Sequence, residues 1–134
     1  MEFLEIERKD LIGIRIIDEQ HSNIADIVNL TYSSVLELNK KESLIHLREL
    51  LELLESHFET EESLMKEVKF PGYISHKLEH DRFYHQILTT IENYKKGTEN
   101  FGIEQLKRIR TWFFNHIEMN DKKCGLFFLD NGIN

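Results

Sequence analysis

Apolar residues recur every three or four positions along most of this chain, the spacing of one buried face on an α-helix. Over residues 18–38 this stripe reads His21, Ile24, Ala25, Val28, Tyr32, Val35. Further helices are predicted at about 41–66, 71–96 and 103–121, and the short connections between them favour antiparallel neighbours. The pattern predicts an all-α fold: an up-down-up-down antiparallel four-helix bundle with an irregular N-terminal arm at 1–17 and a short C-terminal segment.

Local signals suggest where these helices begin and end. Asp18 is expected to be the N-cap of the first helix, and Pro71 suits the first turn of the third. The third helix is expected to end at Gly97 after two lysines, whose charge suits a helix C-terminus. Residues 126–129 are expected to pack over one end of the bundle.

Composition narrows the class of protein. The 134 residues suit a single domain, 1–134, and one proline with six glycines favours helix. The net charge of −7 argues against non-specific nucleic-acid binding, and no apolar run reaches the roughly 20 residues of a membrane span. Without a signal-peptide pattern we expect a cytoplasmic protein, and we expect a monomer. Cys124, the only cysteine, has no partner for an internal disulfide.

Histidines and carboxylates stand out on the inward faces. Two pairs, His57 with Glu61 and His76 with His80, are spaced four residues apart, which on an α-helix is about 40° of rotation and about 6 Å of rise. Each pair therefore presents two groups on one face. An ionised carboxylate in a core is costly unless a cation compensates it, so we interpret these groups as metal ligands. The candidate set is His21, His57, Glu61, His76, His80, His116 and Asp121.

Asp121 does not fit a regular helix. Five residues separate it from His116, and in an α-helix this spacing is a rotation of about 140°. We predict that the helix widens by one residue, as a π-bulge, or ends so that Asp121 folds back.

Imidazole and carboxylate ligands without thiolates suit borderline divalent metals such as iron. Seven protein ligands are more than one ion needs. If both carboxylates and a solvent oxygen bridge two metals, five histidines divide three to two, which leaves one metal with an open position. A small neutral molecule such as dioxygen would fit there.

Four segments closely resemble the bacterial hemerythrins: Asp18–His21, His57–Met65, His76–His80 and Trp112–Lys122. The resemblance covers nearly the whole chain. It implies two iron ions bridged by an oxo or hydroxo group, with dioxygen as a reversible ligand. By this resemblance His76, His80 and His116 ligate the six-coordinate iron, His21 and His57 ligate the iron with the vacancy, and Glu61 and Asp121 bridge. An oxygen pocket is expected from Ile24, Val28 and Phe113.

The chain departs from the usual family pattern at three positions. Phe113 stands where relatives usually have leucine, which predicts a tighter or gated pocket. Cys124 stands where a tyrosine is usual, and Ile6 where a tryptophan is common. Outside the candidate set, His46 is expected to form hydrogen bonds at the end of the bundle, too far away to be a ligand, and His85 is expected to lie on the surface. The acidic run 59–62 is expected to be solvated apart from Glu61.

Three function classes remain open from the residues. Oxygen storage, delivery or buffering, without catalysis, is favoured because imidazoles outnumber carboxylates; an oxygen-consuming enzyme could then be the partner. A di-iron oxidase or peroxidase-like enzyme usually needs paired Glu-x-x-His motifs, and this chain has none. A sensor of oxygen, redox state or nitric oxide would need a separate signalling partner.

Overall fold

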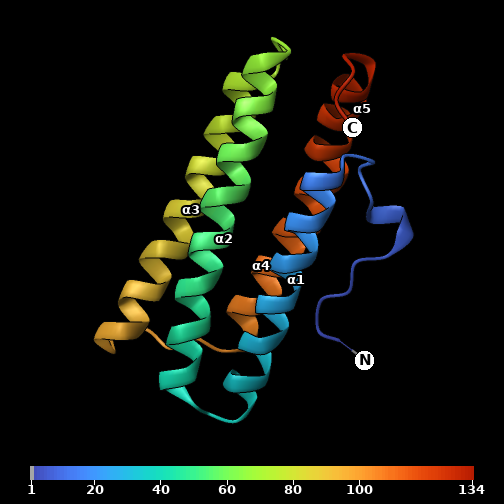
Figure 1. Cartoon of the computed structure of the whole chain (residues 1–134). Coiled ribbons are helices and arrows are strands. Elements are labelled where there is room, and N and C mark those ends of the chain that lie inside the picture. Colours follow the sequence, from blue (N-terminus) through green and yellow to red (C-terminus); the bar gives the residue numbers. More distant parts are fainter. Residues whose placement is uncertain (1) are drawn as a thin grey trace.

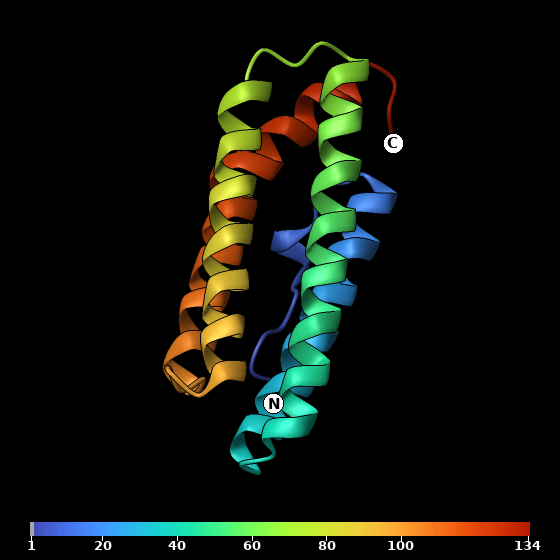
Figure 2. The same ribbon diagram turned by 90° about the vertical axis from the view of Figure 1, so that its left-hand side faces the viewer.

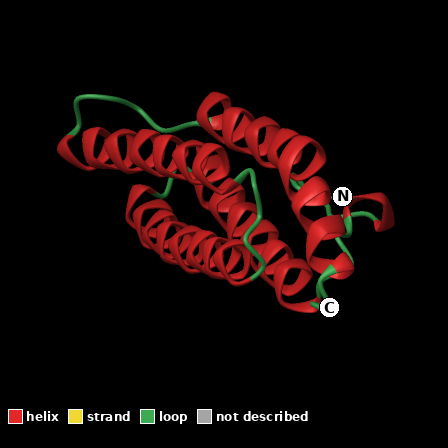
Figure 3. Cartoon of the chain, turned by 90° about the horizontal axis from the view of Figure 1, so that it is seen from above, coloured by secondary structure: helices red, strands yellow, loops and turns green. Residues whose placement is uncertain are grey.

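The computed structural model describes residues 2–134, so the expected start of the arm at Met1 lies outside the described residues. Four long helices form an antiparallel bundle, which confirms the predicted all-α architecture (Figures 1 and 2). The elements are a 3-10 turn at Arg8–Asp10, α1 (Arg15–Leu36), α2 (Lys40–Glu67), α3 (Tyr73–Lys96), α4 (Ile103–His116), a π-helical turn at Ile117–Asp121 and α5 (Lys122–Asp130). Seen from above, loops join the helices at the ends of the bundle (Figure 3).

Two helices begin elsewhere than local signals suggested. Helix α1 begins at Arg15 rather than at Asp18, because Asp18 reaches back from inside the first turn and accepts hydrogen bonds from the backbone N–H groups of Ile12 and Gly13, at 2.8 and 3.0 Å. The Asp18 carboxylate thus pairs backbone donors of the segment that leads into α1 rather than those of the helix itself. Helix α3 begins at Tyr73, with Pro71 in the turn before it.

The inward faces are those that the periodicity indicates. Along α1 the buried positions include every member of the predicted stripe except Tyr32, which is half-buried. Besides their histidines, Glu61 and Ser43, the side chains of α2 and α3 that face the core are large aliphatic and aromatic groups, among them Leu50, Leu54, Phe83 and Ile87. Removing these apolar surfaces from water is the main force that holds the bundle together.

The N-terminal arm is irregular but firmly docked. Leu4 is buried, and its backbone N–H and C=O both bond the side chain of Asn29. The ring of Phe3 stacks on Tyr32 at 4.5 Å between centroids. The guanidinium group of Arg110 lies 4.1 Å from the centroid of the same ring and donates to the Phe3 carbonyl at 2.9 Å. The arm therefore covers the α1 and α4 side of the bundle.

The last helix of the bundle is not one regular helix. Helix α4 passes into five residues of π-helix that end at Asp121, and α5 continues from there. The predicted widening is confirmed, and it leaves the Asp121 side chain buried rather than in solvent. The C-terminal segment is part of α5 and bends over the end of the bundle (Figure 2), but of residues 126–129 only Phe128 is buried.

Candidate metal centre

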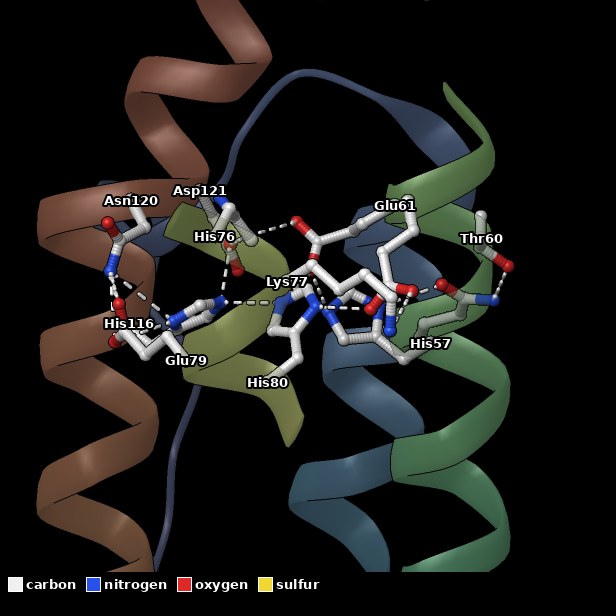
Figure 4. A network of polar contacts seen from close by, with 12 residues as sticks. His57, Thr60, Glu61, His76, Lys77, Glu79, His80, His116, Asn120 and Asp121 are labelled. Atoms are coloured by element: carbon white, nitrogen blue, oxygen red, sulfur yellow. Dashed lines mark hydrogen bonds and ion pairs between the residues drawn. The ribbon is translucent and has the colours of Figure 1, made fainter. Parts of the chain in front are cut away.

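All seven predicted residues converge inside the bundle. They come from α1, α2, α3, α4 and the π-helical turn, and each is at most 4% exposed. Figure 4 shows His57 and Glu61 from α2 facing His76 and His80 from α3, with His116 and Asp121 closing the third side. Because these residues lie on the inward faces of the helices, packing of the bundle brings them together from distant parts of the chain.

The seven side chains form two groups that share one carboxylate. Ligand atoms of Glu61, His76, His80, His116 and Asp121 all lie within 4.8 Å of one another, and so do those of His21, His57 and Asp121. One Asp121 oxygen lies 3.0 Å from His116 Nε2, and the other lies 3.1 Å from His21 Nε2. Asp121 therefore has one oxygen toward each group, which is the arrangement of a bridging ligand.

Several of these atoms have no ordinary hydrogen-bond partner. Within residues 2–134, both oxygens of Glu61, Nε2 of His76 and Oδ1 of Asp121 are buried close to other ligand groups but form no hydrogen bond of ordinary geometry. In addition, the Nε2 atoms of His80 and His116 face each other at 3.0 Å, and those of His21 and His57 at 3.2 Å. Buried polar atoms without partners are costly, and a cation among them would satisfy them together. The donor set, imidazole and carboxylate without thiolate, fits iron.

Protons on the imidazoles can also compensate the buried carboxylates. Burial alone would raise the pKa of Glu61, but the imidazoles of His57, His76 and His80 lower it well below its usual range. Burial opposes a proton on His76, but the nearby carboxylates of Asp121 and Glu61 raise its pKa to about 10. Burial lowers the pKa of His57. The cluster therefore attracts positive charge, which metal ions would supply in place of protons.

A second layer of side chains orients the imidazoles through their Nδ1 atoms. Glu62 accepts a hydrogen bond from His80 at 3.0 Å, and Glu79 accepts one from His116 at 3.2 Å. On the other side of the cluster, His57 Nδ1 bonds the neutral amide oxygen of Gln20 at 2.8 Å. A carboxylate that accepts from Nδ1 raises the basicity of an imidazole as a metal ligand. Within the described part of the chain, only the five-residue group, which contains His80 and His116, has such carboxylates behind its imidazoles.

Helical periodicity did not identify this second layer of side chains, and the prediction for Glu62 was wrong. Glu62 was expected to be solvated, but its side chain is only 15% exposed and bonds His80. The signal that was available is its position next to Glu61 on α2, facing the adjacent helix. Glu79, beside His80 in the sequence, carried the same signal, and Asn120 donates to it at 3.0 Å.

Aromatic rings enclose the cluster. Phe58 stacks on His80 with centroids 4.0 Å apart, and Trp112 stacks on His116 at 4.6 Å. Phe113 meets His21 edge-on at 5.3 Å. These contacts fix the ring orientations and keep water from the imidazoles.

The two remaining histidines lie as expected. His46 bonds Ser34 near the α1–α2 end of the bundle, with 3.3 Å between Nδ1 and the hydroxyl oxygen, and His85 is exposed.

Among the described residues, no helix is long and apolar enough to cross a membrane.

A buried histidine and carboxylate cluster in an antiparallel four-helix bundle defines a metal-binding helical protein. Similarity to known proteins narrows this class, because residues 12–124 match the model of the hemerythrin HHE cation binding domain. The chain belongs to the hemerythrin family.

Named relatives and solved structures agree with this placement. The chain is 28% identical over 108 residues to bacteriohemerythrin of Methylococcus capsulatus, which covers 81% of this chain and 82% of that protein. It is 31% identical over 112 residues to a hemerythrin-like protein of Naegleria gruberi, covering 84% and 82%. A crystal structure of wild-type hemerythrin, 24% identical, superposes with a TM-score of 0.90 over 94% of this chain and 98% of that one.

Proposed function

We propose that this chain binds dioxygen reversibly at a non-haem centre of two iron ions bridged by an oxo or hydroxo group. The shared position of Asp121 between the two groups supports this proposal. In the proposed assignment one ion is held by His76, His80 and His116, the second by His21 and His57, and Glu61 and Asp121 bridge them.

The inequality of the two groups carries the proposal. Five residues make up one group and three the other, and Asp121 is common to both. An ion in the smaller group would have fewer protein ligands and would keep a position for a small ligand. When bound, the ion pair would supply the two electrons that dioxygen takes up and gives back.

The chain's own contribution is to keep the open side dry. Ile24, Val28 and Phe113 are at most 4% exposed, and Phe113 contacts the ring of His21. An apolar wall admits a small neutral molecule and excludes the water and protons that would promote irreversible oxidation. We therefore propose these three residues as the oxygen pocket.

The proposed role is binding without turnover: storage, delivery or buffering of dioxygen. One of the relatives named above, from Methylococcus capsulatus, is a bacteriohemerythrin, and the match covers 82% of its length. A natural partner would be an enzyme that consumes oxygen.

The test is iron analysis combined with optical spectra of the aerated, deoxygenated and azide-treated protein. We expect two irons per chain and charge-transfer bands that disappear on deoxygenation and return with air. His57→Ala should lose this response, whereas the matched control His85→Ala, on an exposed histidine, should keep it. Irreversible oxidation with release of peroxide would contradict oxygen carriage and favour an oxidase or a sensor.

A further inference from the structure

A second candidate binding site lies outside the bundle core, in a groove between α3 and α4. The groove has a volume of about 810 Å³, within the range of about 300–1,000 Å³ typical of small-molecule sites. Its floor is apolar and includes Phe83, Ile87 and Trp112. It is open to solvent, so a ligand could enter without any movement of the helices.

The charge of this groove is opposite to that of the protein. Arg82 and Arg108 line it, together with His85, and none of the described residues that line it is acidic. The whole chain has 24 acidic residues and a net charge of −7, so an acid-free lining with two arginines is distinctive. The groove therefore complements an anion.

The two arginines are also available for binding. Both are exposed, and within residues 2–134 neither forms an ion pair. Two other arginines of the chain are engaged: Arg15 lies 3.7 Å from Glu19, and Arg110 bonds the arm. A guanidinium group binds carboxylate, sulfonate or phosphate oxygens in a bidentate manner.

Apolar floor and cationic rim together suit one class of ligand. We propose that the α3–α4 groove binds a small amphipathic anion, with its acidic group on Arg82 and Arg108 and its apolar body against Phe83 and Trp112. The rings of Phe83 and Trp112 stack with centroids 3.4 Å apart, which holds this part of the apolar floor in place. Because Trp112 also stacks on His116, a bound ligand would lie one ring away from the metal cluster.

Trp112 is the only tryptophan of the chain and lies in the groove, so its fluorescence reports occupancy directly. The probe is 8-anilinonaphthalene-1-sulfonate, an aromatic anion that accepts energy from tryptophan, titrated into the intact chain. The neutral analogue N-phenyl-1-naphthylamine lacks the sulfonate and measures the apolar contribution alone. We expect saturable quenching of Trp112 by the anionic probe and weaker binding of the neutral one.

Charge-removing variants separate this site from non-specific binding. The double variant Arg82→Gln with Arg108→Gln should weaken binding of the anionic probe about tenfold, since each exposed charge contributes modestly, and should leave the neutral probe unchanged. Arg48→Gln, an exposed arginine on α2, is the matched control. Circular dichroism and thermal melting check that all variants are folded. Equal affinity of the double variant and Arg48→Gln, equal binding of both probes, or no quenching of Trp112 would overturn the proposal.

Discussion

The carboxylates behind the imidazoles are predicted to set the affinity of the cluster for metal. Replacing Glu62 or Glu79 with glutamine keeps an oxygen that can accept the Nδ1 hydrogen bond but removes the negative charge. Loss of such an outer partner typically costs 10–100-fold in metal affinity, and because the amide preserves the hydrogen bond we expect the lower end of this range. For Glu62→Gln this means about tenfold, equal to about 1.4 kcal/mol.

The structure also predicts the order of the two effects. The Glu62 side chain is 15% exposed, whereas that of Glu79 is 36% exposed, so solvent screens the second charge more. Glu79→Gln should therefore cost about threefold. The assay is competition between the metal-free protein and a chromophoric chelator for Zn²⁺, which reports coordination without redox chemistry.

Glu59→Gln is the matched control, because Glu59 lies on the same helix as Glu62 but is exposed. It removes the same charge from the protein without touching an imidazole. If Glu62→Gln and Glu79→Gln bind Zn²⁺ as tightly as Glu59→Gln does, the carboxylates do not tune the ligands and the reasoning is wrong.

Four further outcomes are expected. Gly125→Ala should lower the unfolding free energy by about 1–3 kcal/mol, because its Cβ would collide with Ile12 of the arm, and in an Ile12→Ala background the measured cost should shrink. Burial raises the pKa of the Cys124 thiol, so the native protein should resist alkylation that the urea-unfolded protein undergoes readily. Phe113→Leu should speed oxygen association measured by flash photolysis if its ring restricts the pocket, and an unchanged rate would remove that explanation. Because the pKa of His76 is raised to about 10 and that of His116 is also raised, protons compete with metal at neutral pH, and apparent Zn²⁺ affinity should rise between pH 6 and pH 8 in the chelator assay.

The inner site could be predicted because helical periodicity reports direction. A residue four positions from another inward residue also points inward, and the five-residue gap before Asp121 indicated a widened turn for the same reason. Such reasoning works for side chains at the centre of an inward face.

The second layer could not be predicted in the same way. Glu62 and Glu79 lie at the edges of their helices' inward faces. Each residue is a rotation of about 100°, and this spacing is too coarse to tell whether a carboxylate at an edge is solvated or reaches a neighbouring helix. The docking of the arm depends on contacts between distant positions, such as Asn29 with Leu4, and has no periodic signal. Asp18 showed that a residue suited to an N-cap can instead lie inside the helix and bond amides of the segment before it.

The π-helical turn also decides how the chain ends. One extra residue in a turn shifts the angular phase of everything after it by about 100° relative to an uninterrupted α-helix. The phase of α5 therefore depends on the turn, and with it which of its residues face inward: Cys124, Gly125 and Phe128 are buried, and Gly125 lies against Ile12 of the arm. If residues 117–121 formed a regular α-helix with no residue lost, this face would rotate by about 100° away from the arm. The same widened turn thus directs the Asp121 carboxylate into the cluster and the buried face of α5 against the arm.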